Sequence, residues 1–235
     1  MHRNDLFYWL QSILGAYPSL YFPAFARKYP FNQMAVAQDT QICIEGFPRS
    51  ANSYAVVAFR VANPDVKIAH HLHVPAQLIQ ATRLGIPSVL LIRKPEEAVA
   101  SFLVFQQSNQ ADLYLKTYIR FHKALRKLRH KLIVADFELA ITNMNAIIKA
   151  VNEKFAKDFH FLQDQSKQES VIFAKLKEVN DQFFAGQKNK SMYPDENRKQ
   201  AKKEARKLVL NSRRLPAAQA IYKEFLQDAL QLIDE

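Results

Sequence analysis

The chain is poor in three features, and each shortage excludes a class of protein. Among its 235 residues Cys43 is the one cysteine, which excludes an internal disulfide framework and a cysteine-based zinc site. No apolar run reaches the roughly 20 residues of a membrane span, because Pro18 and Pro23 interrupt the aromatic-rich stretch 6–25. Acids are also scarce, with 22 Asp and Glu against 33 Lys and Arg, a formal charge of +11. This surplus predicts a polyanionic partner: nucleic acid, acidic lipid or a phosphorylated cofactor.

The first 40 residues have no secretory pattern, since an acid precedes their apolar residues and no clear small-residue cleavage site follows. We therefore expect a cytoplasmic location. Two interpretations of this aromatic segment stay open. It is either a helix packed on the domain, or a contact with the membrane surface through Phe7, Tyr8 and Trp9.

From residue 41 onward, short apolar runs alternate with amphipathic segments. Strands are expected at 41–45, 66–73, 87–93 and 131–137. Helices are expected at 51–62, 74–85, 94–107, 112–130 and 138–155, and again after residue 164, ending with 216–233. Strands flanked by helices predict an α/β fold, with a three-layer arrangement of a parallel sheet and helices on both faces. We expect one domain over 1–235, with a core at 41–151 and a helical, basic C-terminal extension over 164–235.

The loop after the first predicted strand reads GFPRSANS, residues 46–53. The phosphate-loop pattern G-x-x-x-x-G-K-[ST] would place glycine at Ala51 and lysine at Asn52. Without that lysine a nucleoside triphosphate with magnesium is disfavoured. The cation stands inside the loop instead, at Arg49, and backbone N–H groups at a helix start still form an anion cradle. An ordinary strand-to-helix turn is the alternative.

The stretch FPRSANSY, residues 47–54, resembles the 5′-phosphosulfate loop of the sulfotransferases, usually P-[RK]-S-G-[TN]-[ST]. These enzymes transfer a sulfuryl group from 3′-phosphoadenosine 5′-phosphosulfate (PAPS). The later stretch LLIRKPEEAVASF has Arg93 at a strand end and Ser101 eight residues on, the family's spacing for gripping the 3′-phosphate. A weaker likeness covers ADFEL at 135–139, and the family's C-terminal glycine-rich segment is missing.

The resemblance implies a P-loop NTPase-like fold and a transferase that converts PAPS to adenosine 3′,5′-bisphosphate without a metal. It also implies which residues bind the cofactor: Pro48, Arg49, Ser50, Ala51, Asn52, Ser53, Arg93 and Ser101. Arg49 would further stabilise the bridging oxygen during transfer. Ala51 departs from the family's glycine, and a positive φ there would cost about 1 kcal/mol.

The catalytic base is expected in AHHLHVP, residues 69–75, since imidazole titrates near pH 7. The family's base often stands in T-H-L-P; His73 matches the H-x-P part and His71 the H-L part, so His73 is preferred and His71 is the rival. If the stretch is a strand, His71 and His73 share one face and His70 takes the other. Buried strand-end histidines and an incomplete metal site are the alternatives. Glu45 is a reserve base, or the partner of a cation such as Arg49.

Residues 186–214 hold ten Lys and Arg against three acids. This basic segment could be a lid over the cofactor, a dock for an acidic acceptor or membrane, or a solvated helix. Arg198, Lys199 and Lys202 are the candidates for contact with cofactor or acceptor. The expected acceptor is a hydroxyl or amine of a small molecule, carbohydrate or lipid. A non-catalytic nucleic-acid-binding protein is the alternative function, and it is disfavoured because few aromatics interleave with the basic charge.

Overall fold

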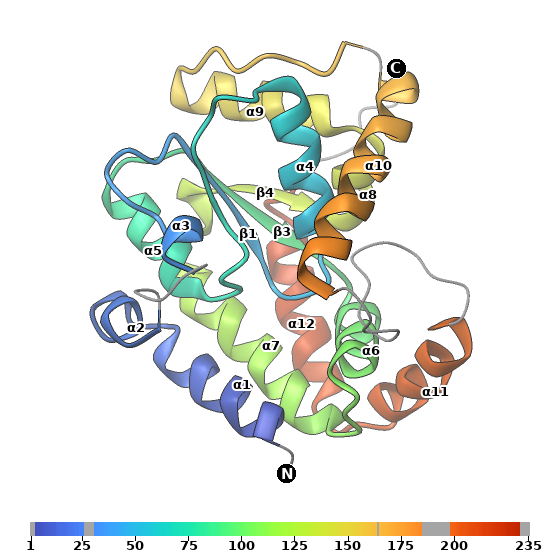
Figure 1. The fold of residues 1–235 in the computed structure, drawn as a ribbon. Coiled ribbons are helices and arrows are strands. Elements are labelled where there is room, and N and C mark those ends of the chain that lie inside the picture. Colours follow the sequence, from blue (N-terminus) through green and yellow to red (C-terminus); the bar gives the residue numbers. More distant parts are fainter. Residues whose placement is uncertain (1–2, 26–30, 164, 185–197, 231–235) are drawn as a thin grey trace.

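The computed structural model describes residues 3–25, 31–163, 165–184 and 198–230. At its centre is a four-stranded, all-parallel sheet in the order β2-β1-β3-β4 (Figure 1). The strands are β1 (Ile42–Gly46), β2 (Ile68–His70), β3 (Ser88–Ile92) and β4 (Ile133–Asp136). The predicted α/β fold with a parallel sheet is thereby confirmed.

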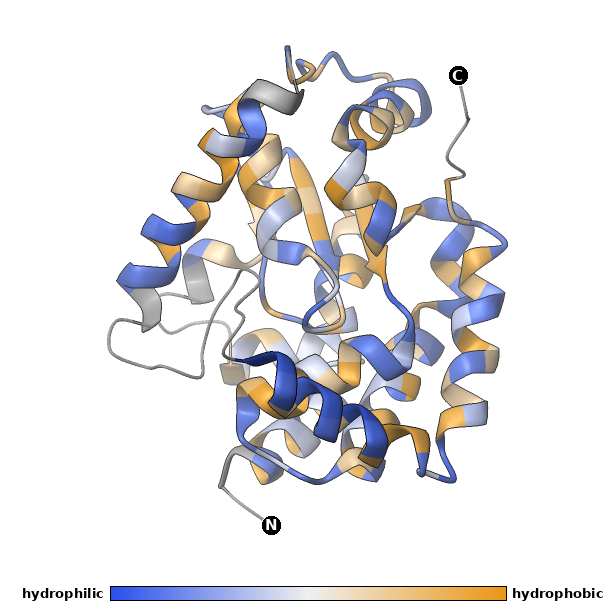
Figure 2. Ribbon diagram, turned by 90° about the vertical axis from the view of Figure 1, so that its right-hand side faces the viewer, coloured by the Kyte–Doolittle hydropathy of each residue, from blue (hydrophilic) through white to orange (hydrophobic). Residues whose placement is uncertain are grey.

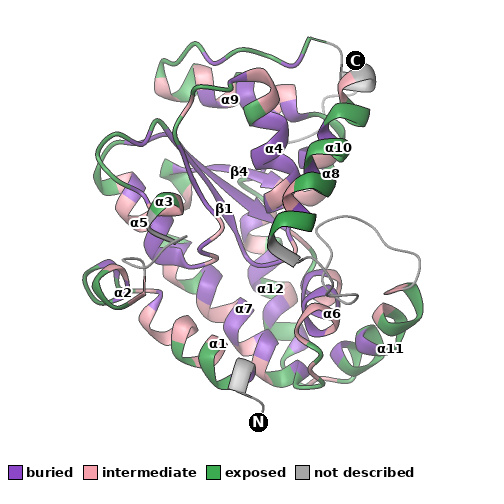
Figure 3. Cartoon of the chain, viewed as in Figure 1, coloured by how far each residue is buried: buried purple, intermediate pink, exposed green. Residues whose placement is uncertain are grey.

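Alternate strand residues enter two separate hydrophobic cores, as the pleat requires. Cys43, Leu90 and Val134 point into one core, whereas Ile44 and Leu91 point into the other. Figure 3 shows the strands buried along their length. A parallel sheet covered on both faces explains why its strands read as continuous apolar runs.

Helices cover both faces of this sheet (Figure 1). The core with Cys43 is closed by α5 (Pro75–Arg83), α6 (Pro95–Gln106), α7 (Ala111–Leu125), α11 (Lys199–Leu210) and α12 (Leu215–Leu226). The core with Ile44 is closed by α4 (Asn52–Ala62), α8 (Phe137–Thr142), α9 (Met144–Phe155) and α10 (Gln165–Phe184). In Figure 2 the apolar colour gathers around the sheet, and α11 is largely hydrophilic.

Several expected elements are confirmed by their local chemistry. Helix α5 begins with Pro75 at its first position and gives way to Gly85, whose φ is +69°. Helix α6 likewise begins at Pro95, with Glu96 and Glu97 in its first turn, where acids favour the helix dipole.

Four expected elements are shorter or broken. The strand predicted at 66–73 ends at His70, because His71 and His73 adopt left-handed backbone angles. The helix predicted at 112–130 is α-helical only to Leu125 and continues as the 3₁₀ helix η1 (Arg126–Lys131).

The helix predicted at 138–155 breaks at Asn143, whose side chain accepts the N–H of Ala146 and so caps α9. The final helix ends at Leu226, although it was expected to reach residue 233, beyond the described residues.

The C-terminal helices are part of the core, not an extension from it. Phe225 of α12 is fully buried, and Leu230 donates its N–H to the carbonyl of Val134 in β4. Helix α11 packs against α6, where Ala205 and Val209 are buried.

At the N-terminus, α1 (Arg3–Leu14) and α2 (Pro18–Phe25) precede the short helix α3 (Phe31–Met34). Tyr8 turns inward, with its ring 5.0 Å from that of Phe102, while Phe7 is exposed. The packed-helix interpretation therefore holds for Tyr8. In the part of the chain that the structure describes, no helix has the length and apolar character needed to cross a membrane.

Candidate functional site

The predicted site residues meet at the carboxyl edge of the sheet. The ends of β2, β1 and β3 are neighbours there, because the three strands are parallel and adjacent. The chain leaves β1 to form β2 on one side and later β3 on the other. In an open α/β sheet this reversal opens a crevice for ligands at the strand ends.

The loop between β1 and α4 has the backbone of an anion cradle. Arg49 and Ala51 both have positive φ, 70° and 68°, with Ser50 between them. Such turns direct successive N–H groups to one side, and the first N–H groups of α4 have no partner within the helix. The positive φ anticipated at Ala51 is therefore present.

Gly46 sets the entry to this loop. A Cβ on Gly46 would lie 2.4 Å from the carbonyl oxygen of Leu91 on β3 and 3.1 Å from Asn52 Oδ1. Only glycine lets β1 approach β3 this closely while Asn52 packs behind it. Asn52 in turn donates from Nδ2 to the carbonyl of Phe47, which closes the loop.

Two buried polar atoms of the loop have no hydrogen-bond partner among the described residues. They are Ser50 Oγ and Asn52 Oδ1, and Ser50 is 0% exposed. Leaving such an atom unsatisfied costs about 1–3 kcal/mol. The hydroxyl of Ser50, beside the Arg49 and Ala51 turns, is therefore a preformed donor for an anion.

The two predicted cofactor motifs are joined by direct hydrogen bonds. Arg93 Nη1 donates to the carbonyl of Arg49 at 2.8 Å, and Arg49 Nε donates to Ser101 Oγ at 3.0 Å. The Arg93 guanidinium also lies 3.7 Å above the ring of Phe137, which holds it in place.

Positively charged side chains lie close together around Arg49. Burial, together with the smaller effects of the charges of Arg198 and Arg93, lowers the pKa of Arg49 to about 9. Arg49 stays protonated at neutral pH, but the repulsion marks a site that favours an anion. Because its Nε is bonded to Ser101, Arg49 lies on the side predicted for the 3′-phosphate.

The basic helix α11 contributes Arg198 at its N-terminal boundary. Lys202 and Arg206 instead pair with Glu97 of α6, at 2.7 and 2.8 Å. Lys199 is exposed on the same helix.

Glu45 organises the histidine loop. Its carboxyl group is fully buried and accepts N–H bonds from Leu72 at 2.9 Å, His73 at 3.1 Å and Gly46 at 3.2 Å. Burial nevertheless raises the pKa of Glu45 to about 8. Among the described residues no ion pair between Glu45 and Arg49 is found; the Glu45 carboxyl group instead lies 3.4 Å from His73 Nδ1.

His73 uses the ring nitrogen Nδ1 in a hydrogen bond, and its side chain is partly exposed. Its Nδ1 lies 3.0 Å from the carbonyl of Gly46, which can only accept, so Nδ1 carries the proton and Nε2 a lone pair. The side chain is 24% exposed. Burial, with a smaller effect of the charge of Arg49, lowers the pKa of His73 to about 4. The imidazole is therefore neutral at pH 7.

His71 has both ring nitrogens engaged. Nε2 lies 2.9 Å from Ser53 Oγ, and Nδ1 lies 2.6 Å from Nδ1 of His70. The histidines therefore contact one another, and no group of three or more metal-ligating side chains occurs among the described residues.

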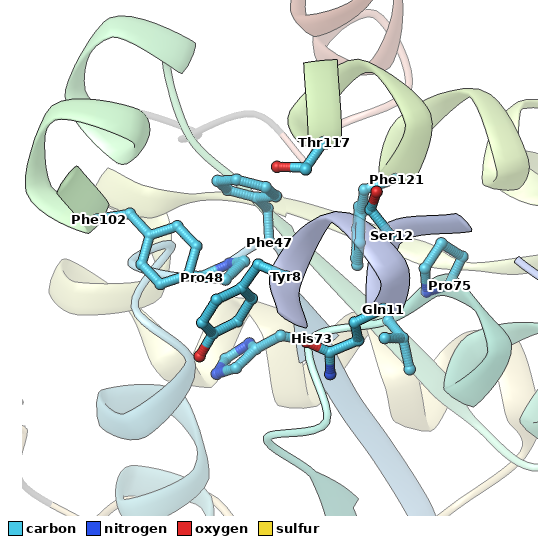
Figure 4. Close-up of a pocket in the computed structure, with 11 residues that line it drawn as sticks. Tyr8, Gln11, Ser12, Phe47, Pro48, His73, Pro75, Phe102, Thr117 and Phe121 are labelled. Atoms are coloured by element: carbon cyan, nitrogen blue, oxygen red, sulfur yellow. The ribbon is translucent and has the colours of Figure 1, made fainter. Parts of the chain in front are cut away.

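A small cavity of about 30 Å³ lies beside His73. Figure 4 shows aromatic side chains of α1, the loop, α6 and α7 around it. These aromatics are Tyr8, Phe47, Phe102 and Phe121. This aromatic wall was not predicted from the sequence; within the helix expected at 112–130, helical spacing of the apolar residues could have indicated the position of Phe121.

Comparison with known proteins adds nothing to this geometry: no family model, no curated protein and no solved structure matches the chain.

Proposed function

We propose that the chain is a PAPS-dependent sulfotransferase with a P-loop NTPase-like fold. The observation that carries the proposal is the hydrogen-bonded connection of Arg93, Arg49 and Ser101 beside the loop at 47–53. Residues more than forty positions apart in sequence share one cationic site with the buried hydroxyl of Ser50, which has no hydrogen-bond partner in the described part of the chain. A nucleotide with phosphates at both its 3′ and 5′ positions is the ligand whose charges match this arrangement.

The two ends of the site suit different phosphates. The backbone N–H groups of Ser50, Asn52 and Ser53, with the hydroxyls of Ser50 and Ser53, would hold the 5′-phosphosulfate at the start of α4. Arg93 and Ser101 would hold the 3′-phosphate, with Arg198 nearby. Arginine suits this role because its planar fork donates two parallel hydrogen bonds to one phosphate.

His73 is the base in this proposal. Its Nε2 lone pair would take the proton of the acceptor hydroxyl or amine, while Nδ1 stays bonded to Gly46. His71 is the weaker candidate, because both of its ring nitrogens are engaged. The donor nucleotide supplies the sulfuryl group: a bond forms from sulfur to the acceptor oxygen or nitrogen, the S–O bond to the phosphate breaks, and the bisphosphate leaves with that electron pair.

The experiment compares adenosine 3′,5′-bisphosphate with adenosine 5′-monophosphate by calorimetric titration. The parent chain should bind the bisphosphate at least roughly 30-fold more tightly than the monophosphate, which is the size of effect expected for charge-assisted hydrogen bonds to one phosphate. Arg93→Gln should remove most of that difference while leaving the monophosphate affinity nearly unchanged. Arg83→Gln, an exposed arginine of α5, is the matched control. Equal affinity of parent and Arg93→Gln for the bisphosphate would overturn the proposal.

A further inference from the structure

A chain of hydrogen bonds runs along α4 and ends at the anion loop. Arg60 Nη2 lies 2.9 Å from His70 Nε2, and His70 Nδ1 lies 2.6 Å from His71 Nδ1. His71 Nε2 then lies 2.9 Å from Ser53 Oγ. None of these distances involves the nitrogen assigned to the base, His73 Nε2.

The backbone explains how this chain is built. Ser53 and Arg60 stand in the first and last turns of α4, seven residues apart, and so share one face of the helix. Two turns of helix separate them by about 10 Å, a gap that two imidazoles can bridge. His70 ends β2 opposite Ile44 of β1, and the positive φ of His71, 58°, turns its ring toward α4.

The direction of every hydrogen bond in this chain is fixed by the arginine at its start, Arg60. An arginine can only donate, so His70 Nε2 must accept and His70 Nδ1 must carry the proton. His71 Nδ1 must then accept, which leaves the His71 proton on Nε2. That N–H donates to Ser53 Oγ, so the hydroxyl hydrogen of Ser53 is directed away from His71.

We infer that Arg60, His70 and His71 are positioning residues that fix Ser53 as a hydrogen-bond donor to the bound anion. Ser53 stands in the first turn of α4, beside the anion loop, so a hydroxyl hydrogen directed away from His71 is available to the ligand. Without the chain, the hydroxyl could equally donate to His71 and present only lone pairs to the ligand, which an anion would repel. The inference rests on the proposed function for the identity of the anion, but not for the direction of the chain.

The burial of the two imidazoles is consistent with this direction of the hydrogen bonds. It lowers the pKa of His70 to about 3, the charge of Arg60 contributing next, and it also lowers the pKa of His71. Both rings are therefore neutral at pH 7, as a chain with one proton on each imidazole requires. Arg60 itself is exposed, so a variant at this position does not open the core.

The first arm of the test measures the tautomers in the protein without nucleotide. Two-bond ¹H–¹⁵N correlation spectra of the imidazoles should show the proton on Nδ1 of His70 and on Nε2 of His71. Arg60→Met removes the donor and should abolish the fixed tautomer of His70, while Arg60→Lys should preserve it. A parent chain with the proton on His70 Nε2 would overturn the inference.

The second arm measures the affinity for adenosine 3′,5′-bisphosphate. Arg60→Met should weaken binding by roughly 3- to 10-fold, which is less than the full loss of a hydrogen bond to a charged group, because Ser53 itself remains. Arg60→Lys should restore the affinity. Arg83→Met is the matched control, because Arg83 is the basic residue in the last turn of α5, as Arg60 is in α4. Equal affinity of Arg60→Met and Arg83→Met would overturn the positioning role.

The two arms separate this inference from the proposed function. If the parent chain does not bind the bisphosphate, the proposed function is refuted, and the direction of the chain is judged on the tautomers alone. His71→Gln offers a further check, because its amide can still donate to Ser53; it should lose less affinity than His71→Leu.

Discussion

Replacing Ala51 by glycine should stabilise the protein. Ala51 holds φ 68° and ψ 15° at the start of α4, and a Cβ in that left-handed region costs about 1–2 kcal/mol. Glycine would remove this strain, but the greater conformational freedom that it gives the unfolded chain would offset about 0.4–1 kcal/mol of the gain in stability. Ala51 also packs partly against the core with Ile44, so some burial is lost. The net expectation is a gain of roughly 0.5–1 kcal/mol, or about 1–4 °C in Tm for a chain of this length.

The assay is thermal and urea unfolding of Ala51→Gly beside a matched control. Ala156→Gly provides it, because Ala156 has φ 50° at the C-terminal end of α9 and is exposed. Both variants should gain stability. Neither should change the affinity for adenosine 3′,5′-bisphosphate, because the loop is already left-handed before binding. A loss of stability in Ala51→Gly alone, or binding tightened more than about threefold, would refute the assigned loop geometry.

Three further outcomes follow from the same contacts. Gly46→Ala should destabilise the fold by at least roughly 1–3 kcal/mol in urea unfolding, because its Cβ would meet the backbone of Leu91; wild-type stability would contradict that packing. The pKa values of His70 and His73 are about 3 and about 4 in the fold, against 6.5 for an ordinary histidine. The unfolded chain therefore binds more protons between these values, and stability should fall as the pH drops from about 6.5 toward 4; a flat profile in that window would be inconsistent with neutral buried rings. The pKa of Glu45 is about 8 in the fold, against 4.5 for an ordinary glutamate, so the folded chain binds more protons between these values. The stability that Glu45 contributes should therefore be lost as the pH rises through that range, and Glu45→Gln should flatten the dependence of stability on pH. An unchanged dependence would rule out the raised pKa.

Much of the fold is predictable from local sequence. The strands at 87–93 and 131–137 were found because apolar runs of that length suit a sheet covered on both faces. Helix starts at Pro75 and Pro95 were found because proline is preorganised for the first turn. The loop at 46–53 was placed correctly because it links such a run to an amphipathic segment.

The histidine loop was not predictable in this way. Period-2 reasoning extended the strand through His73, but the buried carboxyl group of Glu45 takes the N–H groups of Leu72 and His73 and the strand ends at His70. These two hydrogen bonds connect Glu45 with residues that are 27 and 28 positions further along the sequence, so no local sequence pattern could predict them. The link between Arg60 and Ser53 was open to sequence reasoning, since seven residues on one helix place both on one face.

The C-terminal part was misjudged for a similar reason. Its polar composition suggested an extension, whereas the buried stripe of α12 completes the core beneath β3 and β4. The change from α7 to a 3₁₀ helix at Arg126 accompanies ion pairs of Arg126 and Arg129 with Glu224 on α12. Such pairs depend on tertiary contacts that the spacing of leucines does not encode.

The most direct test of the central claim is calorimetric titration of the purified chain with adenosine 3′,5′-bisphosphate, in EDTA and with ATP as control. The proposed site predicts micromolar or tighter binding of the bisphosphate and much weaker binding of ATP, since the loop has Asn52 where a triphosphate site carries lysine. Absence of bisphosphate binding, or tighter binding of ATP, would contradict the assignment.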